Sequence, residues 1–135
     1  LHHQIYFCIQ GVQSLNTKVD LVMKATSFHA MNNYGKIMVG DKGFEFYNDQ
    51  KIQDYIQIPW EEVDYVIASV LFRGKYIPRF AIRTKRSGNF TFAAKKPKEV
   101  LRAIGKYVPS DHMVRSLSFF DVLKRSVKSL FHKDR

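Results

Sequence analysis

Cysteine is nearly absent from this chain of 135 residues. Cys8 is the only one, so the sequence after it offers no thiol for a disulfide, for nucleophilic catalysis or for a metal site. A chain without disulfides is typical of a reducing compartment, and we therefore expect a cytoplasmic location. No apolar run approaches the roughly 20 residues of a membrane-spanning helix. Any contact with a membrane is therefore expected to be peripheral, at its inner face.

Motifs of catalytic and cofactor sites are also missing. The glycines form no phosphate-binding loop, and there is no nucleophile elbow. Three histidines follow the first eleven residues, at positions 29, 112 and 132, and none is paired at a metal-ligand spacing. The acidic group Glu61, Glu62 and Asp64 follows Pro59-Trp60, where a turn is expected, so we predict solvated carboxylates. The sequence predicts no catalytic residue, no metal and no cofactor.

The first eleven residues differ in character from the rest. Leu1-His2-His3, followed by Ile5-Tyr6-Phe7 and Gln10-Gly11, resembles the remnant of a histidine tag and a protease linker. We therefore expect residues 1–11 to be an expression-tag remnant and the folded domain to begin at residue 12.

Charge is distributed unevenly along the chain, which has a formal net charge of +10. Residues 41–64 hold seven acids and two bases, whereas residues 73–135 hold 17 bases and four acids. The positive charge of residues 73–135 indicates either an anionic partner or a solvated basic surface. It carries no information about the fold.

Short alternating segments fill the first two thirds of the chain and predict strands. Phe44 and Phe46 alternate with Glu45, which is typical of a half-buried strand. Asn32-Asn33-Tyr34-Gly35 and Lys85-Arg86-Ser87-Gly88 are predicted turns. The expected strands cover residues 19–31, 36–39, 44–46, 55–58, 63–72, 79–84 and 89–92. In the last pair, we expect Phe80, Ile82, Phe90 and Phe92 to face the core and Arg79, Arg83 and Lys85 to face solvent.

Two helices are expected after the strands. The first follows Pro97 and carries an apolar stripe from Val100 to Val108. The second opens at Ser118, where Ser118-Phe119-Phe120-Asp121 resembles a capping box. Its stripe comprises Phe119, Phe120, Leu123, Val127, Leu130 and Phe131, and its basic side comprises Lys124, Arg125 and Lys128. Such a helix either packs on the core or docks on a partner or membrane interface.

A run of strands followed by helices predicts an α+β fold with an antiparallel sheet. Two segments resemble passages of bacterial pleckstrin-homology-like and GRAM-like domains: Tyr55 to Val63, and the hairpin from Lys36 to Phe46. The resemblance implies a seven-stranded antiparallel bent sheet or barrel, capped by a C-terminal helix. We assign residues 12–109 to this domain and residues 110–135 to a basic amphipathic helical extension.

The chain also resembles a family of uncharacterised proteins of Gram-positive bacteria, often labelled ManO, whose genes lie in mannose-class phosphotransferase operons. The likeness runs from about residue 14 to 131 and is carried by segments 14–21, 25–29, 34–48, 55–66, 78–82 and 113–120. It implies a cytoplasmic accessory or regulatory protein of a sugar-uptake system, and it supplies no catalytic site.

Six bases from two adjoining loops and one strand face are the predicted anion- or partner-binding site: Arg73, Lys75, Arg79, Arg83, Lys85 and Arg86. Clustered cations attract phosphates, and arginine binds them bidentately. We expect binding to an anionic membrane face or to a permease subunit. A nucleic-acid-binding regulator and a structural protein that forms homo-oligomers are the alternatives. No helix-turn-helix spacing supports the former, and the last helix is the expected contact in the latter.

Overall fold

The computed structural model describes residues 8–9, 12–29, 31–51, 53–72 and 75–117. Two short strands, β1 (Cys8–Ile9) and β2 (Val12–Gln13), pair with each other before the main sheet begins. The predicted second helix and its residues Phe119, Phe120, Leu123, Lys124, Arg125, Val127, Lys128, Leu130 and Phe131 lie outside the described residues.

All seven expected strands are present in the sheet. They are β3 (Val19–Ser27), β4 (Asn33–Gly40), β5 (Gly43–Asn48), β6 (Tyr55–Pro59), β7 (Val63–Leu71), β8 (Tyr76–Thr84) and β9 (Asn89–Ala94). Neighbours among them pair antiparallel, and β3 joins the two halves because it pairs with both β4 and β9. Helix α1 (Pro97–Ile104) follows, with proline in its first turn as predicted.

Four expectations are corrected. The sheet has eight strands and is mixed, because β10 (Met113–Leu117) pairs parallel to β7. The strand order is β10-β7-β8-β9-β3-β4-β5-β6, so its edge strands are β10 and β6 and it does not close into a barrel. The fold is mostly β in the described residues, with one short α-helix there. Residues 113–117, which were assigned to the helical extension, are a strand.

Gly35 lies inside β4, not in a turn as predicted. A Cβ at this position would lie 2.0 Å from the Tyr47 carbonyl oxygen on β5. Glycine is therefore needed here because the two strands approach each other closely. Glycine is common in turns, but at this position it lies within a strand and does not end it.

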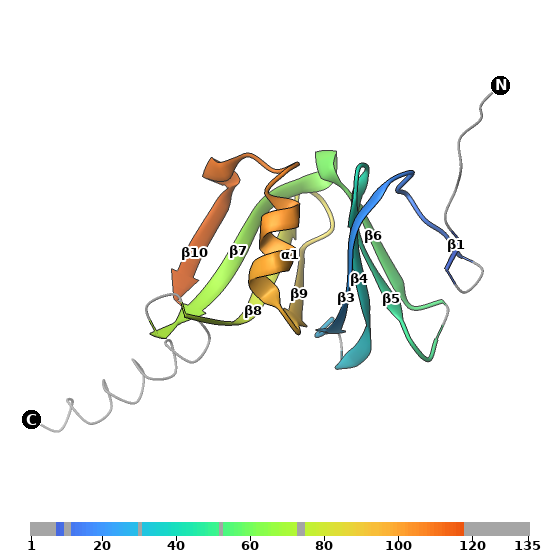
Figure 1. The fold of residues 1–135 in the computed structure, drawn as a ribbon, viewed down its shortest axis with the longest axis horizontal. Coiled ribbons are helices and arrows are strands. Elements are labelled where there is room, and N and C mark those ends of the chain that lie inside the picture. The colour runs from blue at the N-terminus through green and yellow to red at the C-terminus, as the bar shows by residue number, and fades with distance from the viewer. Residues whose placement is uncertain (1–7, 10–11, 30, 52, 73–74, 118–135) are drawn as a thin grey trace, which may run out of the picture.

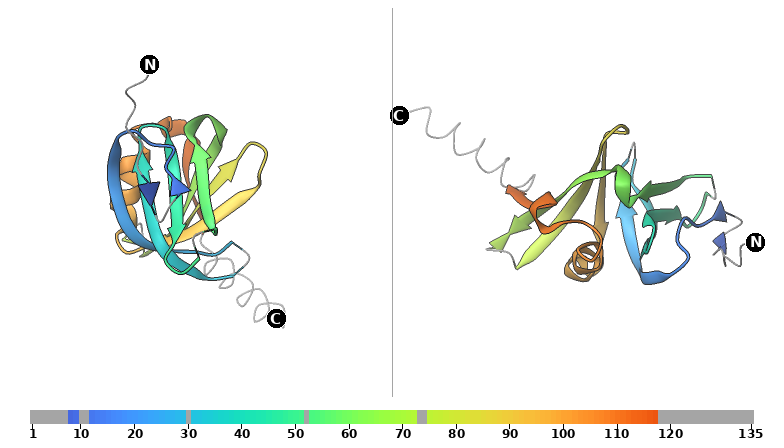
Figure 2. Two further views of the ribbon diagram at one scale, coloured as in Figure 1. Left: turned by 90° about the vertical axis from the view of Figure 1, so that its right-hand side faces the viewer. Right: turned by 90° about the horizontal axis from the view of Figure 1, so that it is seen from above.

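The core lies between the two halves of the bent sheet (Figures 1 and 2). Phe44 on β5 is 4.9 Å from Phe92 on β9 and 6.2 Å from Phe80 on β8, measured between ring centroids. Strands β5 and β8 are not neighbours in the sheet, so these contacts require it to curl. Helix α1 covers the core with Val100, Ala103 and Ile104. Phe80, Ile82 and Phe92 are buried there as predicted, and Phe90 packs against the core.

Candidate functional site

The five predicted binding residues that the structure describes do not form one cluster. Arg73 lies outside the described residues. Lys75 precedes β8 and Lys85 follows it, so a strand of 9 residues, about 30 Å long at about 3.3 Å per residue, separates them. Arg79 and Arg83 lie between them on the outer face of the sheet. The sequence led us to expect these bases to converge, but the structure spreads the described ones along one strand.

Three of the five described bases already have a partner. The Arg83 Nε lies 4.0 Å from an Asp64 oxygen, and the Arg86 guanidinium lies 3.4 Å from a Glu62 oxygen. The Arg79 guanidinium carbon sits 4.1 Å from the centroid of the Phe28 ring, in a cation–π contact. The carboxylates of the predicted acidic group therefore partly neutralise the predicted basic group.

The β7–β8 hairpin end carries exposed aromatic side chains. Phe72 is 68% exposed and has a φ of 53°. A positive φ costs a phenylalanine on the order of 1 kcal/mol or more, because its Cβ crowds the backbone. Tyr76 is 53% exposed, and Lys75 between them is exposed as well. Two large aromatic groups and a cation therefore project at this end of the sheet.

A second basic surface, which sequence reasoning missed, surrounds α1. Residues 95–106 hold five bases and one acid, and all six are exposed. Only Lys96 has an ion-pair partner among the described residues, with its Nζ 3.7 Å from a Glu99 oxygen. The i, i+4 spacing of Lys98 and Arg102 on the predicted helix was the signal that could have found this surface.

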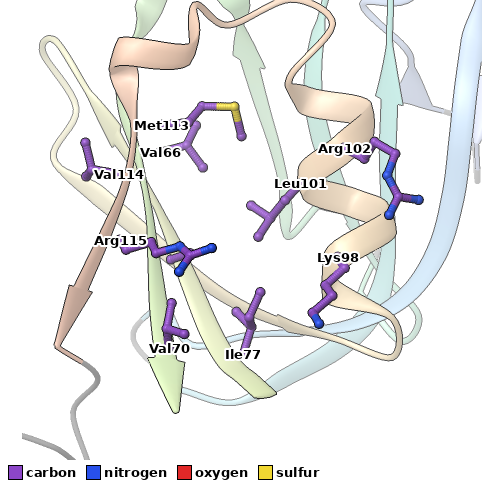
Figure 3. A pocket seen from close by; sticks show the side chains of 10 residues that line it. Val66, Val70, Ile77, Lys98, Leu101, Arg102, Met113, Val114 and Arg115 are labelled. Atoms are coloured by element: carbon purple, nitrogen blue, oxygen red, sulfur yellow. The ribbon is translucent and has the colours of Figure 1, made fainter. Parts of the chain in front are cut away.

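A groove of about 340 Å³ separates α1 from β10 and β7 (Figure 3). Its apolar lining is Val66, Ala68, Val70, Ile77, Leu101, Met113 and Val114, and its charged lining is Lys98, Arg102 and Arg115. Val70 and Ile77 place one end of the groove beside the β7–β8 hairpin end. None of the lining residues is acidic, and none of the three cations forms an ion pair within the part of the chain that the structure describes.

The opposite half of the sheet buries a carboxylate. Glu45 is 0% exposed, although strand alternation predicted it to face solvent. The segment 14–16 covers it: the Ser14 hydroxyl, the Leu15 amide and the Asn16 side-chain amide donate to it at 2.5, 2.8 and 2.8 Å. The Tyr47 hydroxyl donates at 2.6 Å. Burial raises the pKa of Tyr47 above its ordinary value, and its hydrogen bond to Glu45 raises it further.

Asn16 and Asp41 extend this network. The Asn16 side-chain oxygen Oδ1 accepts from the backbone amides of Lys42 and Gly43, and the Asn16 side-chain NH₂ donates to the Gly43 carbonyl. Burial alone would raise the pKa of Asp41, but hydrogen bonds from the Thr17 hydroxyl and from the Lys18 and Thr17 amides lower it below its usual value. No buried side-chain polar atom lacks a partner in the described residues. The network therefore holds residues 14–18, which lead into β3, against the sheet.

The histidines that the structure describes make packing contacts. The His29 ring lies 4.9 Å from the Phe90 ring. His112 stacks on Tyr65 at 4.7 Å, and its Nδ1 lies 2.6 Å from the Asp64 carbonyl oxygen. His132 lies outside the described residues. Within those residues no group of three potential metal ligands comes together, and no helix there is long and apolar enough to cross a membrane.

Comparisons with known proteins agree with this geometry at the level of the fold. The family model of DUF956, a domain of unknown function, matches residues 11–127. The crystal structure of the C-terminal domain of an unknown protein from Leishmania infantum is similar with a TM-score of 0.58 and 9% sequence identity, over 67% of this chain and 83% of that chain. No curated protein matches the sequence. At this identity the Leishmania structure shows the fold alone.

Proposed function

The chain belongs to the DUF956 family, and we propose that it is a non-enzymatic accessory or regulatory module of a mannose-type phosphotransferase system that binds an anionic membrane face. The link to the sugar-uptake system rests on the resemblance to ManO proteins. The membrane contact rests on one observation: Phe72 and Tyr76 are exposed at the β7–β8 hairpin end, close in sequence to Val70 and Ile77, which line the groove whose other wall is the basic helix α1.

Aromatic and basic groups play complementary roles in such a contact. Aromatic rings partition into the interface between headgroups and acyl chains. Basic residues beside an anionic leaflet contribute about 1 kcal/mol each. Lys75 and the five bases of residues 95–106 supply that charge. Nucleic-acid binding would need base-stacking or groove-reading elements, and the phenylalanines of β8 and β9 (Phe80, Phe90 and Phe92) are occupied in the core.

We also propose that β3–β9 with α1 form a pleckstrin-homology-like domain. The order of these seven strands, in which the first pairs with both the second and the last, supports this assignment, as does a helix directly after the last strand. In this interpretation β10 is an added strand at the edge of the domain.

Co-sedimentation with lipid vesicles tests the membrane contact. We expect the chain to pellet with phosphatidylglycerol-containing vesicles and not with pure phosphatidylcholine vesicles, and to detach as ionic strength rises. Phe72→Ser with Tyr76→Ser should weaken binding at least about tenfold, because burying one aromatic side chain is worth about 1.5–3 kcal/mol.

The matched control is Val22→Ser with Tyr55→Ser, which removes two exposed apolar side chains from β3 and β6. This control should bind as the unchanged chain does. Equal binding to both vesicle types, or none, contradicts the membrane contact. Retention of purified permease subunits on the immobilised chain would then identify a protein partner.

A further inference from the structure

We propose that the groove between α1 and β10 is a binding site for a monomeric single-chain lipid anion, with its headgroup between Lys98 and Arg115 and its chain over the apolar floor. This ligand is separate from the bilayer contact proposed above, and its binding does not depend on that contact.

The charges of the groove are concentrated at one end. The Arg115 side chain points from β10 into the groove towards α1, and the Lys98 side chain points from α1 towards the end of the groove near Ile77, whereas Arg102 extends to the far side of the helix (Figure 3). Arg115 and Lys98 therefore line the groove from its two opposite walls, both on the side away from Met113. A guanidinium and an ammonium in this arrangement match a single carboxylate or phosphate.

The remainder of the groove is apolar. Leu101 points from α1 over the floor, and Met113 and Val66 lie at the end away from Lys98 (Figure 3). Leu101 and Met113 are only partly buried although they pack against the core cluster. A volume of about 340 Å³ is at the lower end of the range of about 300–1,000 Å³ for small-molecule pockets, which are mostly apolar with a few placed polar groups.

The chain's own C-terminal segment is a poorer occupant. Its apolar stripe would suit the floor, but residues 118–135 hold five bases and two acids. Placing this positively charged segment beside Lys98 and Arg115 brings like charges together. An anionic ligand neutralises the same two groups, so charge complementarity favours it.

Titration of the full-length chain with decanoate, below the concentration at which it forms micelles, tests the proposal. We expect saturable binding by calorimetry, with amide shifts in the NMR spectrum confined to the segments that line the groove, around residues 66–70, 77, 98–102 and 113–115. Affinity should rise along the series acetate, hexanoate, octanoate and decanoate, by up to about fourfold for each buried methylene. Decanol and decyltrimethylammonium should bind far more weakly, and decyl phosphate separates a preference for phosphate from one for carboxylate.

Lys98→Gln with Arg115→Gln should weaken decanoate binding at least about tenfold, the change expected for losing charge-assisted hydrogen bonds. Both side chains are exposed, so the variant should fold. The control Arg83→Gln with Lys85→Gln removes the same charge from residues outside the groove and should leave affinity unchanged. No binding, equal affinity for decanol, or amide shifts elsewhere overturns the proposal.

The competing occupant is tested in the full chain with Phe120→Ser, Leu123→Ser and Val127→Ser. If the C-terminal segment filled the groove, the unchanged chain would not bind decanoate and this variant would. That result overturns the proposal, whereas equal binding by both chains supports it.

Discussion

Glu45 and Arg115 lie near opposite edges of one sheet, on β5 and β10. They differ in whether the chain itself supplies partners for the charged group. The Glu45 carboxylate is fully buried and accepts four hydrogen bonds from within the chain. Arg115 is exposed, with no ion-pair partner among the described residues. A buried charge must be satisfied within the chain because leaving it alone is very costly, whereas an exposed charge beside an apolar groove is free to bind a ligand. The difference separates a polar region that stabilises the fold from one that is available for binding.

The largest effect is expected from Asn16→Ala in the buried network. Asn16 is 0% exposed, and its loss leaves the amides of Lys42 and Gly43 and part of the Glu45 carboxylate without partners. We expect the free energy of unfolding, measured with urea, to fall by about 3 kcal/mol. Asn33→Ala removes an exposed hydrogen bond to the Met31 carbonyl and should cost less than about 0.5 kcal/mol. Similar costs for both would remove the distinction between the two regions.

The sequence was informative about the sheet because alternation is a local signal. It located all seven strands from β3 to β9, and it placed Phe80 and Ile82 in the core. It missed the strand β10, because its pairing with β7 joins segments 47 residues apart, as in the pair Met113 with Val66. Alternation also predicted a solvated Glu45, because nothing in β5 reveals that residues 14–16 cover its second face.

The candidate site was only partly predictable for the same reason. The bases around β8 were found as a run in the sequence, but the length of the strand keeps Lys75 and Lys85 apart. The groove draws Lys98 and Arg115 from α1 and β10, and only the pairing of β10 with β7 brings them to one place. Phe72 was the last residue of the expected strand 63–72 and Tyr76 lay outside the expected strands, and the exposure of both depends on how the hairpin end projects.

Tyr107→Phe tests a second polar contact in which the chain supplies both partners. The Tyr107 hydroxyl donates to Asp20, and its ring stacks on Trp60 at 5.1 Å. The hydrogen bond to Asp20, with burial and the negative charge of Asp20, raises the pKa of Tyr107 from 10.0 to about 12. The folded state therefore holds this proton more tightly than the unfolded state. The resulting stability is complete below pH 10 and is lost as the pH rises through about 12.

We expect Tyr107→Phe to lower the free energy of unfolding by about 1–2 kcal/mol at neutral pH, with little difference from the unchanged chain above the folded pKa. Urea unfolding at several pH values measures this. Phenylalanine retains the stack on Trp60, so Tyr107→Ala should cost more at every pH. If the unfolding free energies of Tyr107→Phe and the unchanged chain differed by the same amount at all pH values, the stabilisation would not depend on the proton of the Tyr107 hydroxyl.

Leu101→Ala tests whether the groove floor is open. Leu101 is partly buried, whereas Ile104 on the same helix is 0% exposed. We expect Leu101→Ala to cost about 1 kcal/mol of unfolding free energy and Ile104→Ala about 3 kcal/mol, because only the second leaves a closed cavity. Equal costs, measured by urea unfolding, would mean that the floor is covered in solution.

The smallest effect is expected from Lys98→Gln with Arg102→Gln on α1. Neither cation has an ion-pair partner within the described ranges, so their removal should change the free energy of unfolding by less than about 0.5 kcal/mol. The sign should be stabilising at low ionic strength, because the repulsion among the bases of residues 95–106 is reduced, and the effect should fade as salt screens it. Lys96→Gln is the control, because it removes the contact with Glu99 and should be slightly destabilising. A loss above about 1 kcal/mol for the double variant would mean that acidic groups of the chain already hold these cations, and the basic surface would then stabilise the fold as the Glu45 network does.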